Sequence, residues 1–329
     1  MTENSERVVY VNGEFVPEKE AKISIYDSAL MFGDMVFEMT RSFNKKQFKL
    51  KEHIDRLYSS IEHVEIPFSL KKEELIELCN RTIEKNEPSF SKHDEHRLVI
   101  NVSRGPLGIY ADVFGGKLEP TIIIADFPLK WTVQGMGSLF DEGINAVITK
   151  QRAVPAELID PKVKNRSRLH YMKAVLEVSK LPGKNNWALL LDPDGFVAEG
   201  SGDNFFIIKD GILLTPEPRN ILLGISRKYV FELAEQLGIK YKEENLLPKD
   251  VENADEAFMT ATPFCMLPVT KLNGNNIGDG KRGKIFNLIL KKWSNNVGVN
   301  IEEQIKIFNK ETSKNELKGP TPYQFKTKQ

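Results

Sequence analysis

The sequence predicts an α/β protein made of two domains that share a cleft. The chain has 329 residues, which is long for one small domain and suits two. In the first half, apolar residues at helical spacing alternate with apolar runs typical of strands. The second half contains short strands separated by turn residues. The predicted bounds are 1–126 for an N-terminal α/β domain, 127–133 for a linker, 134–301 for a C-terminal domain and 302–329 for a polar tail.

The N-terminal domain is predicted to begin with a hairpin, because "VVYVNGEFV" places Asn12-Gly13 between two apolar runs. The stretch "MVFEMTRSF" then alternates, so that Phe37, Arg41 and Phe43 share one strand face. An arginine in such a row requires a partner, which is either a protein acid or a ligand. Helices are expected at 50–64 and 71–86, and strands at 96–105 and 121–129. A proline and a glycine in "DFPLKWTVQG" break the pattern and mark the domain boundary.

The C-terminal domain is predicted to start with a strand at 145–154, followed by a helix over 168–181 that ends at Pro182-Gly183. Three strands, at 187–191, 196–208 and 212–216, form a meander with Asp-Gly at both turns. A helix over 225–238 closes with Gly238, and a strand follows at 256–263. From residue 302 the chain is polar without a clear period, which favours a tail.

Composition excludes several classes of protein. The formal net charge is zero, so no nucleic acid partner is indicated. No apolar run is long enough to span a membrane, and the N-terminus lacks the apolar core of a signal peptide. The two cysteines are far apart, which suits a cytoplasmic protein without disulfides. The histidines of "HDEH" (93–96) have no third ligand nearby, so no metal site is predicted.

Four local features could carry chemistry. Lys164 lies between a predicted strand and a helix, and Glu199 lies where a strand breaks into "GSGDN". The helix that opens at Ile225 and Ser226 has free backbone amides, as does the turn in "TATP" around Thr262. Each feature alone has a plain structural explanation, such as a surface lysine or a helix cap. Together they supply an amine for a Schiff base, an acid for a pyridine nitrogen and donors for a phosphate. This combination indicates pyridoxal 5′-phosphate as cofactor.

The order of motifs "NGEFVP…ISIYDSALMFGDMVFEMTR…KEHIDRL…VKNRSRL…VAEGSGDNFF…LLGISR…FMTATP" resembles that of the class IV pyridoxal-phosphate aminotransferases. That family includes branched-chain and D-amino-acid aminotransferases and aminodeoxychorismate lyases. The resemblance runs from about residue 8 to about residue 290. It implies a smaller N-terminal α/β domain, a larger C-terminal pseudo-barrel domain, the cofactor in the cleft between them, and a homodimer.

The resemblance also implies roles for individual residues. Lys164 matches the Schiff-base lysine, Glu199 the acid that faces the pyridine nitrogen, and Leu222 the apolar residue against the ring. The phosphate would be held by Arg56, Ile225, Ser226 and Thr262. The substrate pocket would be formed by Phe32, Phe37, Arg41, Arg104 and Ala261.

Departures from the family pattern concentrate around the substrate. Branched-chain enzymes have tyrosines where this chain has Phe32 and Leu169, and Pro263 lacks an amide that they use on the substrate carboxylate. The Arg-x-His pair of D-amino-acid enzymes is also missing from "SRGPLGIY". Arg41 and Arg104 are therefore the candidate carboxylate ligands. In the plain alternative, Arg41 pairs with a protein acid and Arg104 is solvated.

The resemblance implies an aminotransferase that moves an amino group between a hydrophobic amino acid, with branched-chain ones as first candidates, and a 2-oxo acid such as 2-oxoglutarate. The alternatives are an aminodeoxychorismate-type lyase and a D-amino-acid or amine transaminase of the same family.

Overall fold

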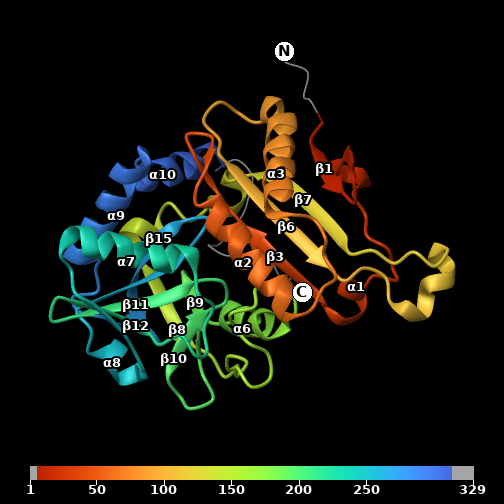
Figure 1. The fold of residues 1–329 in the computed structure, drawn as a ribbon. Coiled ribbons are helices and arrows are strands. Elements are labelled where there is room, and N and C mark those ends of the chain that lie inside the picture. The colour runs from red at the N-terminus through yellow and green to blue at the C-terminus, as the bar shows by residue number, and fades with distance from the viewer. Residues whose placement is uncertain (1–5, 313–329) are drawn as a thin grey trace. The chain divides into compact units, whose positions relative to one another are not determined.

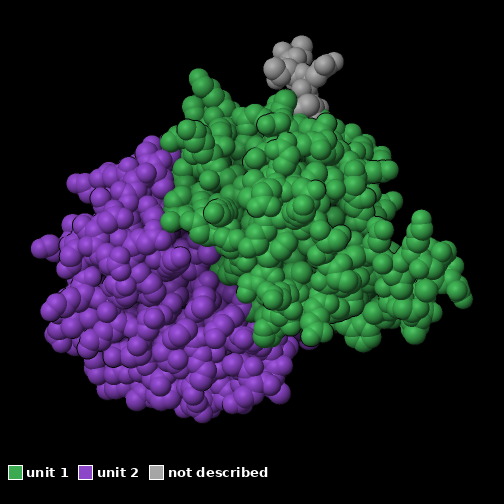
Figure 2. Space-filling view, viewed as in Figure 1, with its two compact units in different colours: residues 1–129, 163–168 green, residues 130–162, 169–329 purple. Residues whose placement is uncertain are grey.

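The computed structural model describes residues 6–312 and divides the chain into two compact units. Unit 1 comprises Met1–Leu129 and Val163–Arg168, and unit 2 comprises Lys130–Lys162 and Leu169–Gln329 (Figure 2). The chain leaves unit 1 after Leu129, inside the predicted linker. The second boundary differs from the prediction, because the short segment around Lys164 groups with unit 1 and interrupts the supposedly continuous C-terminal domain.

Unit 1 is a five-stranded sheet with two helices on one face (Figure 1). The strand order is β2 (Glu14–Pro17), β1 (Val8–Val11), β7 (Thr121–Pro128), β6 (His96–Ser103) and β3 (Met35–Met39). Helix α2 (Leu50–His63) packs on β3, and α3 (Lys72–Asn86) packs on β1 and β7. The shorter elements are η1 (Glu18–Glu20), α1 (Ser28–Phe32), β4 (Ser42–Phe43), β5 (Lys46–Gln47), η2 (Glu87–Ser89) and η3 (Gly108–Phe114).

The core of unit 1 lies between this sheet and its helices, as the alternation of apolar residues requires. Val36, Leu98, Ile100, Val102 and Ile124 point from the sheet toward Ile54, Leu57, Ile61, Leu75 and Cys79 on the helices. The predicted hairpin is present, with Asn12 and Gly13 at positive φ between paired strands. The alternating stretch is not one strand, however. β3 ends at Met39, and Phe43 pairs with Lys46 in a separate two-stranded ribbon.

Unit 2 contains a nine-stranded sheet and the remaining helices. Its strands are β8 (Ile144–Ile148), β9 (Asn186–Leu191), β10 (Val197–Gly200), β11 (Asn204–Lys209), β12 (Ile212–Pro216), β13 (Tyr241–Glu244), β14 (Glu256–Ala261), β15 (Cys265–Leu272) and β16 (Asn275–Asn276). Its helices are α4 (Lys130–Val133), α5 (Leu139–Glu142), α6 (Leu169–Ser179), α7 (Ile225–Leu237), α8 (Pro248–Glu252), α9 (Lys284–Val297) and α10 (Ile301–Thr312).

Two predictions for unit 2 are wrong in detail. The strand expected over 196–208 is two antiparallel strands, β10 and β11, which pair Glu199 with Asn204 around a tight turn. The tail expected from residue 302 begins instead with helix α10. Ile301, Ile305 and Phe308, at helical spacing, are buried along it. The rest of the predicted tail, 313–329, lies outside the described residues.

Both cysteines, Cys79 and Cys265, are buried free thiols. Within residues 6–312, none of the helices is both long and apolar enough to cross a membrane. The same residues contain no group of three histidine, cysteine or carboxylate side chains suited to a metal ion.

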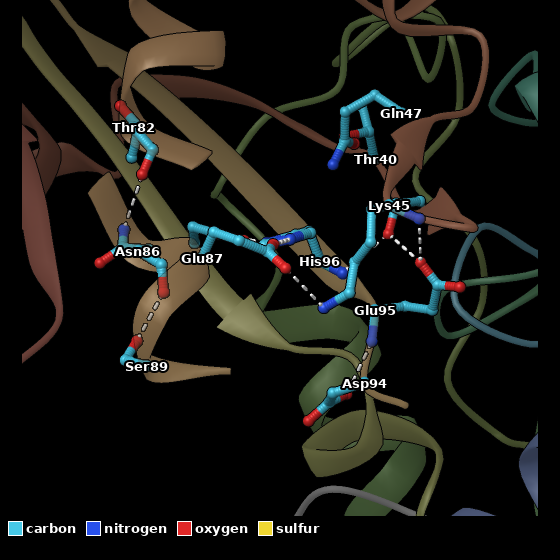
Figure 3. Close-up of polar contacts among 12 residues, drawn as sticks. Thr40, Lys45, Gln47, Thr82, Asn86, Glu87, Ser89, Asp94, Glu95 and His96 are labelled. Carbon is cyan, nitrogen blue, oxygen red and sulfur yellow. Dashed lines mark hydrogen bonds and ion pairs between the residues drawn. The ribbon is translucent and has the colours of Figure 1, made fainter. Parts of the chain in front are cut away.

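His96, from the "HDEH" stretch, is buried in a polar cluster of unit 1 (Figure 3). Its Nδ1 lies 2.7 Å from the Asp126 carboxylate, and its Nε2 contacts that of Glu87. The ring of Phe90 stacks on the imidazole at 4.4 Å. Burial alone lowers the pKa of His96, but hydrogen bonds and charge from Asp126 and Glu87 outweigh it, so the pKa of His96 is raised.

The raised pKa of His96 makes stability depend on pH. A histidine whose pKa is raised by folding stabilises the folded protein fully at pH values below its pKa in the unfolded chain, about 6.5. This stabilisation is lost as the pH rises through its pKa in the folded protein. We expect the free energy of unfolding to fall above about pH 6.5. His96→Gln should flatten this dependence and lower the free energy at pH 6 by about 3 kcal/mol. Urea unfolding of both proteins from pH 6 to 9 tests this, and parallel pH curves would contradict it.

Candidate active site

Lys164 is held at the edge of the unit 1 sheet by its backbone. Its carbonyl accepts from the Phe37 amide at 2.9 Å, and the Arg166 amide donates to the Met35 carbonyl at 2.8 Å. Asn165 thereby forms an antiparallel bridge with Val36 of the edge strand β3. Gly33, beside Ser167, has a φ of +68°, a backbone conformation that favours glycine. The segment therefore presents the Lys164 side chain from a rigid frame.

Arg56, predicted to bind the phosphate, belongs to a buried cluster on the helix-covered face of the sheet. Its Nε and Nη2 donate to the two oxygens of Glu38 at 2.6 and 2.9 Å. His53, one helical turn before Arg56 on α2, places Nδ1 2.7 Å from Glu38. This bidentate pairing fixes the guanidinium in one orientation.

The charge states in this cluster follow from burial and pairing. Burial raises the pKa of Glu38, but the charges and hydrogen bonds of Arg56 and His53 outweigh burial and hold that pKa far below its usual range. The pKa of His53 is lowered, first by burial and also by the charges of Arg56 and Lys164. Glu38 is therefore ionised, and a neutral His53 donates to it through Nδ1–H.

In unit 2, Glu199 is a buried carboxylate that accepts from three donors. The Tyr171 hydroxyl donates to Oε1 at 2.5 Å, and Asn204 Nδ2 and the Leu222 amide donate to Oε2 at 3.2 and 3.1 Å. Asn204 also donates to the Leu222 carbonyl at 2.9 Å. Glu199 and Leu222, separate in the sequence, are thus joined through one asparagine.

The predicted phosphate-binding residues of unit 2 lie on α7 and on a neighbouring turn. Helix α7 begins at Ile225 and Ser226, as predicted, with Gly224 at the N-cap and no side-chain cap. A Cβ at Gly224 would collide with Asn204, so this close turn requires glycine. Thr262 lies in the turn between β14 and β15, after Ala261. A helix start without a side-chain cap leaves its first amides and dipole available to an anion.

The predicted substrate residues have different environments. Phe37 is buried on β3, whereas Phe32 at the end of α1 is 69% exposed. Arg41 is 1% exposed, and its guanidinium lies 3.9 Å from the centre of the Phe43 ring. Its Nε donates to the Ser42 carbonyl at 3.1 Å. The other member of the set, Ala261, is half-buried at the end of β14.

Arg104 is engaged within unit 1 by partners that the sequence did not indicate. Its Nε donates to Asp34 at 2.7 Å, and Nη1 and Nη2 donate to the carbonyls of Glu65 and Val64 at 2.8 and 2.7 Å. These carbonyls follow the C-terminus of α2, where a cation is stabilised by the helix dipole. Arg104 therefore fastens this helix end to the loop of Asp34.

Three residues of this arrangement were missed in the sequence: Glu38, His53 and Tyr171. A signal existed for the first two. Glu38 is an acid within an apolar strand run, and His53 and Arg56 are three residues apart on one helix face. No comparable signal existed for Tyr171, which reaches Glu199 only because α6 packs on β9.

The donor set suits pyridoxal phosphate. A buried carboxylate with fixed hydrogen-bond donors is a group that would face a pyridinium, and a helix start without a side-chain cap and an oriented arginine are each groups that would bind a phosphate. Lys164 has a primary amine of the kind through which such cofactors would be attached.

Comparison with known proteins identifies the family of the chain. Residues 35–272 match the model of the class IV amino-transferase family. A putative branched-chain-amino-acid aminotransferase of Methanocaldococcus jannaschii is 38% identical over 288 residues, which cover 87% of this chain and 94% of that protein. A D-alanine aminotransferase of Listeria monocytogenes is 30% identical over 280 residues, covering 84% and 91%.

Among solved structures, the branched-chain amino acid aminotransferase of T.th., complexed with N-(5′-phosphopyridoxyl)-L-glutamate, superposes with a TM-score of 0.75 and 27% identity. The match covers 89% of this chain and 95% of that one. The predicted fold class, a two-domain class IV fold with a pseudo-barrel sheet, is confirmed. The chain belongs to the class IV aminotransferases, whose cofactor is pyridoxal 5′-phosphate.

Proposed function

We propose that this aminotransferase moves an amino group between a branched-chain L-amino acid and 2-oxoglutarate. The observation that carries the proposal is the 38% identity to a putative branched-chain-amino-acid aminotransferase over 94% of that protein. The buried, triply hydrogen-bonded Glu199 supports the chemistry, because an ionised carboxylate favours a protonated pyridine ring.

We assign the roles as follows. Pyridoxal phosphate supplies an electron sink that makes the hydrogen on the substrate α-carbon acidic. Lys164 would hold the cofactor through Nζ, and the same amine would carry a proton to and from the substrate α-carbon. Glu199 keeps a proton on the ring nitrogen, and Leu222 packs against the ring. Arg56, Ile225, Ser226 and Thr262 bind the phosphate. Phe32, Phe37 and Ala261 contact the substrate, and the Arg41 guanidinium lies over the Phe43 ring.

A donor panel tests this proposal. The purified protein loaded with cofactor is mixed with L-leucine, L-isoleucine, L-valine, their D-enantiomers, D-alanine and isopropylamine. Conversion of the bound cofactor to its amine form is followed by absorbance, and the 2-oxo acid product is identified. We expect the L-branched-chain donors to react fastest. A preference for a D-amino acid would contradict the proposal and indicate a D-amino-acid transaminase. Release of pyruvate from 4-amino-4-deoxychorismate without an acceptor would contradict it and indicate a lyase.

A D-amino-acid transaminase is the second candidate, and a specific observation favours it. The Listeria D-alanine aminotransferase is 30% identical over 91% of its length. Phe32 and Leu169 also replace two tyrosines that are typical of branched-chain enzymes. The enantiomers in the donor panel decide between the two candidates.

We also propose that the enzyme is a homodimer of the cytoplasm. The free thiols of Cys79 and Cys265 suit a reducing compartment. An apolar edge of unit 1, defined here as Ile25, Leu30, Phe32, Ile109 and Val113, has side chains that are 61–80% exposed. The contact between the rings of Tyr26 and Tyr110, 4.8 Å apart, joins its two segments. Such a patch favours association with a second copy.

The apolar edge gives a test of assembly. Ile109→Glu places a charge in a desolvated interface and should weaken the dimer by at least about 100-fold in Kd. Sedimentation of the variant, of the parent and of a Lys117→Glu control measures this. A parent that sediments as a monomer, or a variant as dimeric as the parent, would contradict the proposal.

A further inference from the structure

Arg166 lies on the same side of the sheet edge as Lys164. Residues 164–166 run antiparallel to β3 with Asn165 opposite Val36, which faces the helices. Alternate side chains of an extended segment point to the same face, so Lys164 and Arg166 both project on the face opposite the helices. Phe37, on that same face of β3, lies beneath them.

The guanidinium of Arg166 is held in one orientation. It lies 3.6 Å from the centre of the Phe37 ring. Nε and Nη2 both donate to Oδ1 of Asn101, at 2.9 and 2.6 Å. Asn101 is directly opposite Phe37 across β3 and β6. The contacts with the Phe37 ring and with Asn101 remove part of the side-chain entropy of this exposed arginine before any ligand binds.

Positive charge converges on this ring beside the reactive amine. Lys164 Nζ is 4.8 Å from the centre of the Phe37 ring, and the Arg168 guanidinium is 5.7 Å from it. Under the proposed function, the substrate α-carbon is delivered to Lys164. The carboxylate one bond from that carbon is then the substrate anion that lies nearest to this cluster. A planar guanidinium is the side chain best matched to it.

The other arginines are less suited to the task. Arg104 already donates from Nε, Nη1 and Nη2 to Asp34, Glu65 and Val64, and Arg41 is 1% exposed.

We propose that Arg166 binds the α-carboxylate of the amino-acid and 2-oxo-acid substrates, with Phe37 and Asn101 positioning its guanidinium. The proposal rests on the proposed aminotransferase function. It makes Arg166, and neither Arg41 nor Arg104, the residue that selects substrates carrying a carboxylate.

Equilibrium binding separates this role from catalysis. The holoenzyme is titrated by calorimetry with 4-methylpentanoate, an unreactive carboxylate, and with 4-methylpentanamide, its neutral counterpart. We expect the parent to prefer the acid. Arg166→Gln should weaken binding of the acid by at least about tenfold and leave the affinity for the amide unchanged. The affinity of Arg166→Lys for the acid should lie between those of the parent and Arg166→Gln, because lysine keeps the positive charge but cannot form the two parallel hydrogen bonds of a guanidinium. Lys162→Gln, an equal charge change on an exposed neighbour, is the control.

Kinetics provide a second reading. The KM values for 2-oxoglutarate and 4-methyl-2-oxopentanoate should rise by a similar factor in Arg166→Gln, since both share the α-carboxylate. A rise for 2-oxoglutarate alone would assign Arg166 to the second carboxylate and overturn the proposal. The proposal would also be overturned if Arg166→Gln bound the acid as tightly as the parent does, or if the variant lost affinity for the acid and the amide equally. A parent that binds the acid no more tightly than the amide would overturn it as well. If the parent transaminates L-leucine but gives any of these results, only the role of Arg166 is contradicted. If the parent is inactive on every amino acid, the proposed function itself is contradicted.

Discussion

Lys164→Ala should lower aminotransferase turnover by at least about 10⁴-fold and leave the fold of the chain unchanged. The variant loses both the covalent attachment of the cofactor and the group that moves the α-proton. The contacts that hold the segment are made by the backbone, through the Lys164 carbonyl to the Phe37 amide and the Lys164 amide to the Ser60 hydroxyl. Alanine retains these, and the Lys164 side chain is not among the apolar residues of the unit 1 core.

Stopped-flow measurement of the half-reaction with L-leucine, with Lys162→Ala as control, tests this expectation. A second readout does not depend on activity. Because the charge of Lys164 helps to lower the pKa of His53, removal of the amine should shift that pKa upward in an NMR titration of the apoprotein. A small primary amine added to the variant should restore part of the proton transfer. Turnover near the parental rate without added amine would remove Lys164 from the mechanism.

The sequence predicted the elements whose signals are local. The hairpin at Asn12-Gly13, the helices α2 and α7 and the glycine at the end of α7 depend on residues close together in the chain, and all are present. Helix α10 was missed although its signal is also local. Ile301, Ile305 and Phe308 recur at four and three residues, but the charged residues between them hide the period.

The pairing of charged groups could not be predicted in the same way. Arg104 contacts Asp34 and the end of α2, and Arg166 contacts Asn101. These contacts exist only once β3, β6 and α2 have packed together. An arginine has several donors and a long side chain, so its position in the sequence limits its partner very little. The assignment of Lys164 to unit 1 has the same origin, since the bridge to β3 joins residues more than a hundred positions apart.

Glu199→Gln should retain the cofactor but slow the proton-transfer step by about 10²-fold. The amide has the same shape as the carboxylate and can keep the local hydrogen bonds. Its oxygen can accept from Asn204 and the Leu222 amide, while its nitrogen donates to the Tyr171 hydroxyl, which is able to reverse its role. The lost property is the negative charge. Without that charge, a protonated ring nitrogen is no longer favoured, and the α-hydrogen of the substrate becomes less acidic.

The loss should therefore appear in the chemical step and not in substrate binding. Single-turnover rates with α-deuterated L-leucine should show a larger isotope effect in Glu199→Gln than in the parent, while the affinity for 4-methylpentanoate stays the same. Tyr171→Phe removes one hydrogen bond but keeps the charge, so its effect should be several-fold smaller. Glu244→Gln, on an exposed strand of unit 2, controls for the change of charge. If Glu199→Gln and Tyr171→Phe slow the reaction equally, the carboxylate acts through its position alone, and its charge is not the source of the rate.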